Sequence, residues 1–300
     1  MLVIGHAPAM TDQETQATGV IVITGAAGGM GRACVTAFQD SGPLLLLDVE
    51  EKSVREVAAA ANAAGAVATP LVVDVSRQAD VDAAAEQVAA GGGLRTLIHT
   101  AGISPTMADG RTVLEVDLVG TARLTRALLP SVRPGSVAVC VASIGGQMGP
   151  AADAVDNALN DPLAPDFLAQ LEEAVGMELN GSVAYALAKR GVISLCEREA
   201  AAWGAQGGRI VSISPGLIDT PMGRLEAAEN EGMAFMIGLT PVSRADDQGS
   251  ETMPGRVEDI AAAAVFLASP AASFVSGCDL RVDGGLVGAI RHMDVAAFGG

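Results

Sequence analysis

Short, unbroken apolar runs recur along this chain, and each is separated from the next by a longer, alanine-rich segment. Runs without polar alternation are typical of strands buried on both faces, as in a parallel sheet whose crossovers are helices. Seven runs are predicted to be strands, at residues 20–24, 44–48, 71–75, 94–100, 135–143, 208–214 and 278–285. The pattern predicts the α/β class, with one doubly wound domain, a mostly parallel seven-stranded sheet and helices on both faces.

Helices are expected between these strands, near residues 51–64, 77–90, 111–129 and 183–204. Two stretches break the rhythm. Residues 149–181 contain two proline breaks and then a periodic stretch, and we interpret them as an insertion formed by a loop and one helix. Residues 221–255 are interpreted as a substrate lid, because long irregular segments in a compact domain are usually functional or mobile. The domain is expected to span residues 19–290, after a polar extension at 1–18 and before a tail at 291–300.

Charge and cysteine usage narrow the possible partners and surroundings. A formal net charge of −17 argues against nucleic acid and against an anionic membrane surface, because both would be repelled. The opening MLVIGHAPAM lacks a basic region, and no later segment approaches an unbroken apolar membrane span. The cysteines are scattered with no C-x-x-C pair, so we predict neither a disulfide framework nor a metal site, and we expect a reducing, cytoplasmic setting.

A glycine-rich turn follows the first predicted strand in VIVITGAAGGMGRA, with glycines at 25, 28, 29 and 31. Small residues let the backbone turn tightly and approach a pyrophosphate, whose charge is bound by the first amides of the following helix. Such turns also occur for packing alone. The position between the first strand of the sheet and a helix favours a dinucleotide-binding loop, and with it a Rossmann-like domain.

Asp48 ends the second predicted strand, where a carboxylate can accept hydrogen bonds from the adenosine ribose hydroxyls. The same carboxylate would repel the 2′-phosphate of NADP. Its alternative role is to cap the helix that begins with EEKSVREV, since Asp is a favoured N-cap residue. Gly28 offers no basic side chain to a phosphate, so we expect NAD as the cofactor, with NADP less favoured.

The stretch SVAYALAKR carries Tyr185 and Lys189, which lie one helical turn apart on the same face. Taken alone, the pair indicates a packed ring beside a solvated lysine. Downstream of a cofactor loop it indicates an acid/base pair, because holding a tyrosine as phenolate at pH 7 costs about 4 kcal/mol unless a neighbouring cation stabilises it. His99, at the end of a predicted strand, is interpreted as structural, since the tyrosine already supplies the acid.

The ordered motifs TGAAGGMG, YALAK, SPGLIDTPM and VDGG resemble those of the short-chain dehydrogenase/reductase family, and the similarity covers nearly the whole chain. The resemblance implies that Ser143, Tyr185 and Lys189 are the catalytic Ser-Tyr-Lys, and that Asp117 stands at the place of a catalytic asparagine. The cofactor contacts that it implies are Thr24, Gly25, Gly28, Gly29, Met30, Gly31, Asp48, Val49, Asp74, Val75, Thr100, Ala101, Gly102, Tyr185, Lys189, Pro215, Gly216, Ile218 and Thr220.

Two departures from the family pattern are informative. The family usually has Asn in a Val-Asn-x-x-Gly context, whereas VDLVG places Asp117 there, which is nearly isosteric, adds a charge and cannot donate as the amide does. The second departure is the spacing, because Ser143 precedes Tyr185 by 42 residues and most members have a much shorter separation. The surplus matches residues 149–181, and a subset resembling the bacterial 3α-hydroxysteroid dehydrogenase/carbonyl reductases has a helical insertion at this place.

Together these features predict an NAD-dependent oxidoreductase that interconverts a secondary alcohol and a ketone, on a bulky hydrophobic substrate such as a hydroxysteroid. Tyr185 would exchange the hydroxyl proton, and Ser143 would hold the reacting oxygen. The alternatives are a 3-oxoacyl thioester reductase and, because of Asp117 and Thr100, a catalytically weak dinucleotide-binding sensor or scaffold. We expect a homo-oligomer, with a dimer through the C-terminal interface favoured over the family's usual tetramer, because residues 149–181 are expected to cover the other interface.

Overall fold

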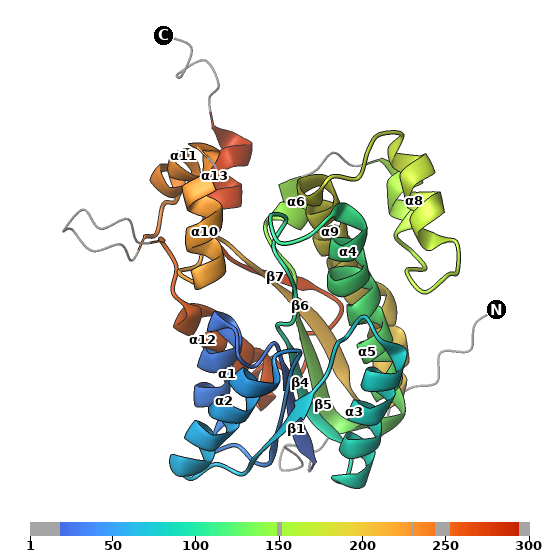
Figure 1. Ribbon diagram of the computed structural model, residues 1–300, viewed down its shortest axis with the longest axis vertical. Coiled ribbons are helices and arrows are strands. Elements are labelled where there is room, and N and C mark those ends of the chain that lie inside the picture. The colour runs from blue at the N-terminus through green and yellow to red at the C-terminus, as the bar shows by residue number, and fades with distance from the viewer. Residues whose placement is uncertain (1–18, 149–151, 230, 244–252, 294–300) are drawn as a thin grey trace.

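The strands of the structure lie close to the apolar runs and form one sheet. They are β1 (Val20–Thr24), β2 (Leu44–Asp48), β3 (Ala68–Val72), β4 (Leu94–His99), β5 (Val132–Val141), β6 (Arg209–Pro215) and β7 (Asp279–Val282). All neighbouring strands are parallel, in the order β3-β2-β1-β4-β5-β6-β7, so the predicted seven-stranded α/β fold is confirmed. The computed structural model describes residues 19–148, 152–229, 231–243 and 253–293 (Figure 1), and the expected extension at 1–18 lies outside them.

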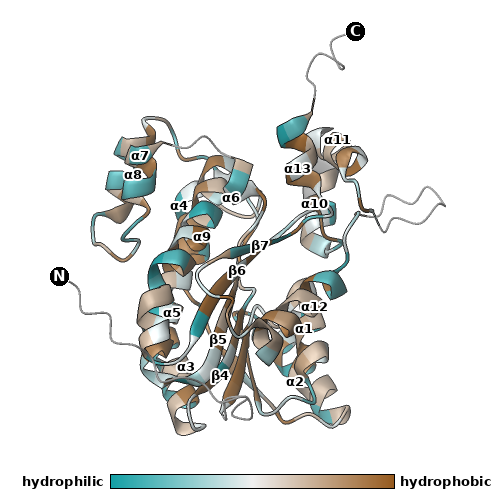
Figure 2. Cartoon of the chain, turned by 180° about the vertical axis from the view of Figure 1, so that it is seen from behind, coloured by the Kyte–Doolittle hydropathy of each residue, from teal (hydrophilic) through white to brown (hydrophobic). Residues whose placement is uncertain are grey.

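Helices pack on both faces of this sheet (Figure 1). One face is covered by α1 (Gly29–Phe38), α2 (Glu51–Ala63) and α12 (Val257–Ala268). The other is covered by α3 (Gln78–Ala90), α4 (Gly110–Leu114), the π-helical turn η1 (Glu115–Val119), α5 (Gly120–Leu128) and α9 (Gly181–Ala205). Alternate residues of β1 enter the two cores, since Val20 and Val22 face one set of helices while Ile21 and Ile23 face the other. Figure 2 shows the resulting strands as hydrophobic along most of their length.

The order of the strands places the site. The chain runs outward from β1 in one direction through β2 and β3, and in the other through β4 to β7. In such sheets, ligands bind in the crevice outside the carboxyl ends of the strands where the direction reverses. The loops after β1, β4, β5 and β6 meet at that edge.

The third strand lies earlier in the sequence than the apolar run predicts. The prediction placed it at residues 71–75, whereas β3 is Ala68–Val72. It is the edge strand, where Pro70 is tolerated because its missing N–H is not needed by an outer neighbour. The apolar residues Val73 and Val75 are buried beyond the strand, and Val73 N–H still donates to the Asp48 carbonyl over 2.9 Å. The apolar run at 71–75 was predicted to be a strand, but its later residues are apolar because they are buried in the loop after β3.

The described part of the expected insertion at 149–181, residues 152–181, contains two helices before α9 begins, where one was expected. They are α7 (Asp153–Ala158) and α8 (Phe167–Val175), which follow the short α6 (Gly145–Met148). Arg190 of α9 donates to both carboxylate oxygens of Asp156 in α7, at 2.5 and 2.6 Å. Arg111 of α4 forms an ion pair with Glu172 of α8 at 2.7 Å. Through these contacts α7 is held against α9 and α8 against α4, on their outer side.

Residues 221–255 contain α10 (Pro221–Glu229) and α11 (Glu231–Leu239), and part of this expected lid lies outside the described residues. The short helix α13 (Leu286–His292) crosses the expected domain boundary at 290. The remaining short turns are η2 (Leu129–Ser131) and η3 (Pro270–Ala272). No helix among the described residues is both long enough and apolar enough to cross a membrane.

Candidate active site

The glycine loop between β1 and α1 is held in a conformation that side chains would disturb. Gly25 has φ +60°, and a methyl group built on it would lie 2.8 Å from the backbone of Ala101. A methyl group on Gly31 would collide with the Gly25 carbonyl oxygen. Gly28 is exposed, and a methyl group on Gly29 would approach the side chain of Thr220 to 3.1 Å. The loop therefore brings bare backbone to the start of α1, opposite the segment that follows β6.

Asp48 binds the glycine loop and does not cap the next helix. Its Oδ2 accepts from Ala27 N–H at 2.9 Å and its Oδ1 accepts from Glu50 N–H at 3.1 Å. Glu50 is the N-cap residue of α2, and its side chain accepts from Lys52 N–H at 3.3 Å. The carboxylate of Asp48 thus lies at the end of β2 against the loop, as the ribose-binding interpretation requires.

Thr24 connects the glycine loop to the strand end that carries the Thr-Ala-Gly motif. Thr100 Oγ1 donates to the Thr24 carbonyl at 2.7 Å, and Ala101 N–H donates to Thr24 Oγ1 at 3.1 Å. Gly102 follows, and a methyl group built on it would lie 3.2 Å from Lys189 Nζ and from Asp117 Oδ1. Thr100, where the family usually has Asn, therefore ties the ends of β1 and β4 together.

Ser143 and Tyr185 converge although 42 residues separate them. Ser143 follows β5, and its Oγ accepts from Gly145 N–H at 3.1 Å. A methyl group built on Gly145 would lie 3.5 Å from both Ser143 Oγ and Tyr185 Cε1, so both side chains border one small space. Tyr185 is half-buried, and Lys189 Nζ lies 5.5 Å from the centre of its ring. The three side chains form one cluster at the carboxyl end of β5.

Asp117 joins this cluster from η1 as a buried ion-pair partner. Its Oδ2 lies 2.9 Å from Lys189 Nζ, and its Oδ1 accepts from Ile103 N–H at 2.8 Å. Lys189 Nζ also lies 3.4 Å from the Val141 carbonyl oxygen. Burial raises the pKa of the Asp117 carboxyl, against the opposing effect of Lys189. Burial disfavours the charged form of Lys189, but Asp117 and Tyr185 outweigh it and raise the pKa of the lysine.

A hydrogen-bond chain through His99 links the glycine loop to Asp117. His99 Nδ1 lies 2.7 Å from Thr24 Oγ1, and Nε2 lies 2.9 Å from Thr121 Oγ1. Thr121 donates its own proton to the Asp117 carbonyl at 2.7 Å, so it must accept from His99, which assigns the ring proton to Nε2. Complete burial lowers the pKa of His99 to about 3, with a smaller effect of Lys189. His99 is therefore neutral and structural.

The segment after β6 forms the opposite wall. Gly216 N–H donates to the Val282 carbonyl at 3.0 Å, and a methyl group on Gly216 would lie 2.7 Å from Asp283. Ile218 is buried and pairs with Gly255 in an isolated bridge. Thr220 Oγ1 accepts from Gly223 N–H at 2.9 Å and so caps the start of α10. Residues 215–220 are thus fixed between β7 and the lid, facing the glycine loop.

The remaining predicted cofactor contacts lie at the start of α1 and after β2 and β3, and they differ in exposure. Val49 is 66% exposed beside Asp48, and Met30 is half-buried at the start of α1. Asp74 Oδ1 accepts from Ser76 N–H at 2.9 Å, and Val75 is buried. The side chain of Val75 packs in the core, against Gly120 at the start of α5. The contact of Asp74 and Val75 with adenine stays a prediction.

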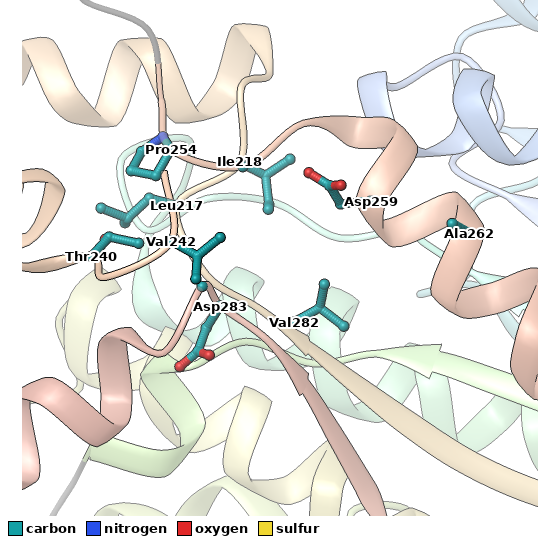
Figure 3. Close-up of a pocket in the computed structure, with 11 residues that line it drawn as sticks. Leu217, Ile218, Thr240, Val242, Pro254, Asp259, Ala262, Val282 and Asp283 are labelled. Atoms are coloured by element: carbon teal, nitrogen blue, oxygen red, sulfur yellow. The ribbon is translucent and has the colours of Figure 1, made fainter. Parts of the chain in front are cut away.

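A cavity of about 230 Å³ lies between the segment after β6, the start of α12 and the end of β7, and Figure 3 shows the residues that line it. It is bordered by Leu217 and Ile218, by Thr240 and Val242 of the lid region, and by Asp283. None of the three clustered catalytic candidates lines it. The cavity therefore lies behind the wall formed by residues 215–220.

Three residues of the site were not singled out from the sequence. Thr121 lies one helical turn after Asp117, and that spacing was the available signal. Gly145 lies two residues after Ser143, and Arg190 directly follows Lys189. Their roles depend on contacts between distant segments, which spacing along the chain does not indicate.

Comparison with known proteins identifies the family of this chain. A family profile described as short chain dehydrogenase matches residues 19–156, and one described as Enoyl-(Acyl carrier protein) reductase matches residues 170–287. The cis-4-hydroxycyclohexanecarboxylate dehydrogenase of Sinomonas cyclohexanicum is 31% identical over 283 residues, which are 91% of this chain and 98% of the relative. The chain belongs to the short-chain dehydrogenase/reductase family. Members of this family are oxidoreductases of secondary alcohols and ketones and typically use a nicotinamide dinucleotide.

Further family members show the same similarity. An uncharacterized short-chain type dehydrogenase/reductase of Sinorhizobium fredii is 31% identical over 287 residues. That match covers 92% of this chain but 45% of the relative, so the chain spans less than half of its length. A crystal structure of a short-chain dehydrogenase/reductase described as glucose/ribitol dehydrogenase, from Brucella melitensis, has a TM-score of 0.68 at 25% identity and covers 90% of this chain and 96% of its own.

Proposed function

We propose that this chain is an NAD-dependent dehydrogenase/reductase that interconverts a secondary alcohol and a ketone on a bulky hydrophobic substrate such as a hydroxysteroid. The observation that carries the proposal is the cluster of Ser143, Tyr185 and Lys189 beside the glycine loop. Ser143 and Tyr185 border the same space, and the lysine ammonium lies 5.5 Å from the tyrosine ring. A proton donor, an oxygen-binding hydroxyl and a cation are the groups that this reaction needs.

The residues around the loop fit a dinucleotide. A side chain at Gly25 would collide with the backbone of Ala101, and one at Gly31 with the Gly25 carbonyl, so the glycines let the loop turn closely onto the start of α1, whose first amides can bind a pyrophosphate. The wall at residues 215–220 faces the loop through Thr220 and Gly29. When bound there, NAD would accept or supply the hydride. The described chain then has to orient the dinucleotide and exchange one proton with the substrate.

Tyr185 would exchange that proton. In alcohol oxidation its phenolate takes the hydroxyl proton, and in ketone reduction its phenol donates one to the carbonyl oxygen. Lys189 stabilises the phenolate electrostatically, which offsets part of the roughly 4 kcal/mol needed to ionise a tyrosine at pH 7. Ser143 Oγ would donate a hydrogen bond to the reacting oxygen and keep it next to Tyr185.

The preference for NAD over NADP rests on Asp48. Its carboxylate is fixed at the end of β2 by Ala27 N–H and Glu50 N–H, and further lone pairs remain for the ribose hydroxyls. A 2′-phosphate at this place would meet a negative charge, with the exposed Gly28 offering no cation.

An apolar cluster beside the catalytic serine supports a hydrophobic substrate. Ile144 directly follows Ser143 and packs with Leu286 and Val287, and Met236 of the lid region joins them. Phe235 of α11 is 49% exposed. Ile144, Leu286 and Val287 are buried and form the base of the cluster, so an aliphatic ring system would bury apolar surface against the accessible Met236 and Phe235, at about 25 cal/mol per Å². The relative from Sinomonas, whose name states an alicyclic hydroxy acid, is consistent with a ring substrate.

A second candidate is the reduction of a 3-oxoacyl thioester. The observation that favours it is the match of residues 170–287 to a profile described as Enoyl-(Acyl carrier protein) reductase. An acyl chain would use the same apolar cluster.

Absorbance at the NADH band, with hydroxysteroid, aliphatic and 3-oxoacyl thioester substrates, tests the proposal. We expect turnover of the bulky cyclic alcohols or ketones with NAD(H) and at least about tenfold weaker use of NADP(H). Preference for the thioester would favour the second candidate. Tight NADH binding without turnover of any substrate would contradict both and support a sensor or scaffold.

Association and location complete the proposal. We place the protein in the cytoplasm, which is supported by four free cysteine thiols. We propose a homodimer through α12 and the edge strand β7, because Phe266 and Phe274 of this region are 47% and 103% exposed. The helices α7 and α8 contact the outer side of α4 and α9. This is the face at which the second interface of the family's usual tetramer is expected.

A further inference from the structure

The carboxylate of Asp117 serves two partners that an amide could not serve together. Oδ1 accepts from Ile103 N–H at 2.8 Å, and Oδ2 lies 2.9 Å from Lys189 Nζ. A carboxylate has two acceptor oxygens, whereas the asparagine that the family usually has offers one acceptor and two donors. In this geometry an amide would turn its NH₂ group toward either the lysine ammonium or the Ile103 N–H. The charge at position 117 is therefore built into the arrangement.

Lys189 depends on this carboxylate because it is 5% exposed. Titratable groups face it from several elements: Asp117 on η1, Tyr185 on α9 itself, Cys140 on β5 and His99 on β4. His99 is neutral, and the Val141 carbonyl lies 3.4 Å from Nζ. Among these groups Asp117 is the carboxylate, and it is the closest charged group to the ammonium. The ion pair is what balances the loss of water around Lys189.

We propose that Asp117 is a positioning residue that keeps Lys189 in its ammonium form and fixes it beside Tyr185. Breaking a buried ion pair by removing one partner leaves an uncompensated charge. A buried lysine then gives up its proton more readily, and a neutral amine does not stabilise a phenolate. Asp117 would thus act on the reaction through Lys189. This inference rests on the proposed function, because it assigns the proton exchange to Tyr185.

The pH profile of alcohol oxidation tests the proposal in the Asp117→Asn variant. We expect the acidic limb of kcat, where the rate rises with pH as Tyr185 ionises, to move to higher pH by about one unit or more, because Tyr185 loses the field of a nearby cation. At pH 7 the rate would then fall at least about tenfold. A profile that coincides with that of the unchanged protein, or that moves to lower pH, overturns the proposal.

Asp109→Asn is the matched control for this substitution. Asp109 caps α4 by accepting from Thr112 N–H at 2.9 Å, in the same helical stretch but without contact to Lys189. Asparagine caps helices as well as aspartate does, so its profile should match that of the unchanged protein. A shift of similar size in this control would show that the loss of any nearby carboxylate suffices, which overturns the specific role of Asp117.

A thermal double-mutant cycle tests the ion pair without any turnover. Asp117→Asn and Lys189→Met should each lower Tm, and the double variant should lose clearly less than the sum, because neither charge is left unpaired. Additive losses, or failure of both Asp117→Asn and the double variant to fold, overturn the proposal. If the proposed function fails because no alcohol or ketone is turned over, this cycle still decides whether Asp117 sustains the charge of Lys189.

Discussion

His99 is the residue that connects the strand end before the glycine loop to the cluster of Ser143, Tyr185, Lys189 and Asp117. Its ring accepts from Thr24 on β1 and donates to Thr121 on α5, which in turn donates to the Asp117 carbonyl. Each of these buried polar atoms would cost about 1–3 kcal/mol if it lost its partner. The sequence predicts a structural role for His99 but not its partners, because they come from elements far apart in the chain.

The neutral state of His99 predicts an acid-sensitive stability. Its pKa is near 6.5 in the unfolded chain and about 3 in the folded one, so between these values only the unfolded state binds the proton. The contribution of neutral His99 to the free energy of unfolding is complete above pH 6.5. It is lost as the pH falls toward 3, and the loss amounts to up to about 5 kcal/mol. Urea unfolding of His99→Asn should show a slope shallower by up to about 1.4 kcal/mol per pH unit. Parallel pH dependences in the two proteins would contradict this assignment.

At the scale of elements, the packing of α6 on α9 fixes the helix that carries Tyr185 and Lys189. A methyl group on Gly146 would lie 2.6 Å from the backbone of Lys189 and Arg190, which cannot move without shifting α9. A methyl group on Gly145 would meet Ser143 and Tyr185 only at 3.5 Å, an ordinary contact distance. Two adjacent glycines therefore have different tasks, one for packing and one for access to the site.

This difference predicts that alanine at one glycine lowers stability and that alanine at the other lowers activity. Gly146→Ala should lower the free energy of unfolding by about 1–3 kcal/mol, as overpacking typically does. Gly145→Ala should leave Tm nearly unchanged but reduce kcat/KM, because its methyl group occupies the space between the serine and the tyrosine. Tm by calorimetry and steady-state kinetics on both variants measure the two effects. The reverse pattern would show that the roles are exchanged.

The elements themselves could be predicted where apolarity and burial coincide. The predictions for β1 and β2 match the structure to the residue, because each strand is an unbroken apolar run up to the polar residue that ends it, Thr24 or Asp48. The prediction failed for the edge strand β3, where apolar residues continue into a buried loop. It also missed α7, whose position depends on Asp156 pairing with Arg190 of α9. The pairing of Ser143 with Tyr185 is predicted only by the family resemblance. The fold shows that both side chains border the same space next to Gly145.

At the scale of the whole molecule, the edge of the sheet at β7 lies beside large exposed apolar side chains. The edge strand β7 has a neighbour on one side within the described sheet, and Phe274 just before it is fully exposed. An exposed sheet edge beside large apolar side chains favours association with a second copy. The outer side of α4 and α9, by contrast, is in contact with α7 and α8.

If two copies associate through the β7 edge, a single charge at Phe274 should disrupt the dimer. Phe274→Glu should shift the sedimentation coefficient to that of a monomer, because the charge would be buried without a partner at the interface. Phe235→Glu in the lid region, also exposed in the monomer, is the matched control and should leave the dimer intact. Equal sedimentation of the Phe274 variant and the unchanged protein would exclude this interface.

The proton exchange by Tyr185 is the central claim, and Tyr185→Phe tests it most directly. The substitution removes the phenol oxygen while keeping the half-buried ring, so the helix and its packing stay in place. We expect the rate of NADH formation to fall by about 10²–10⁴-fold with the affinity for NADH nearly unchanged. Turnover equal to that of the unchanged protein would contradict the mechanism.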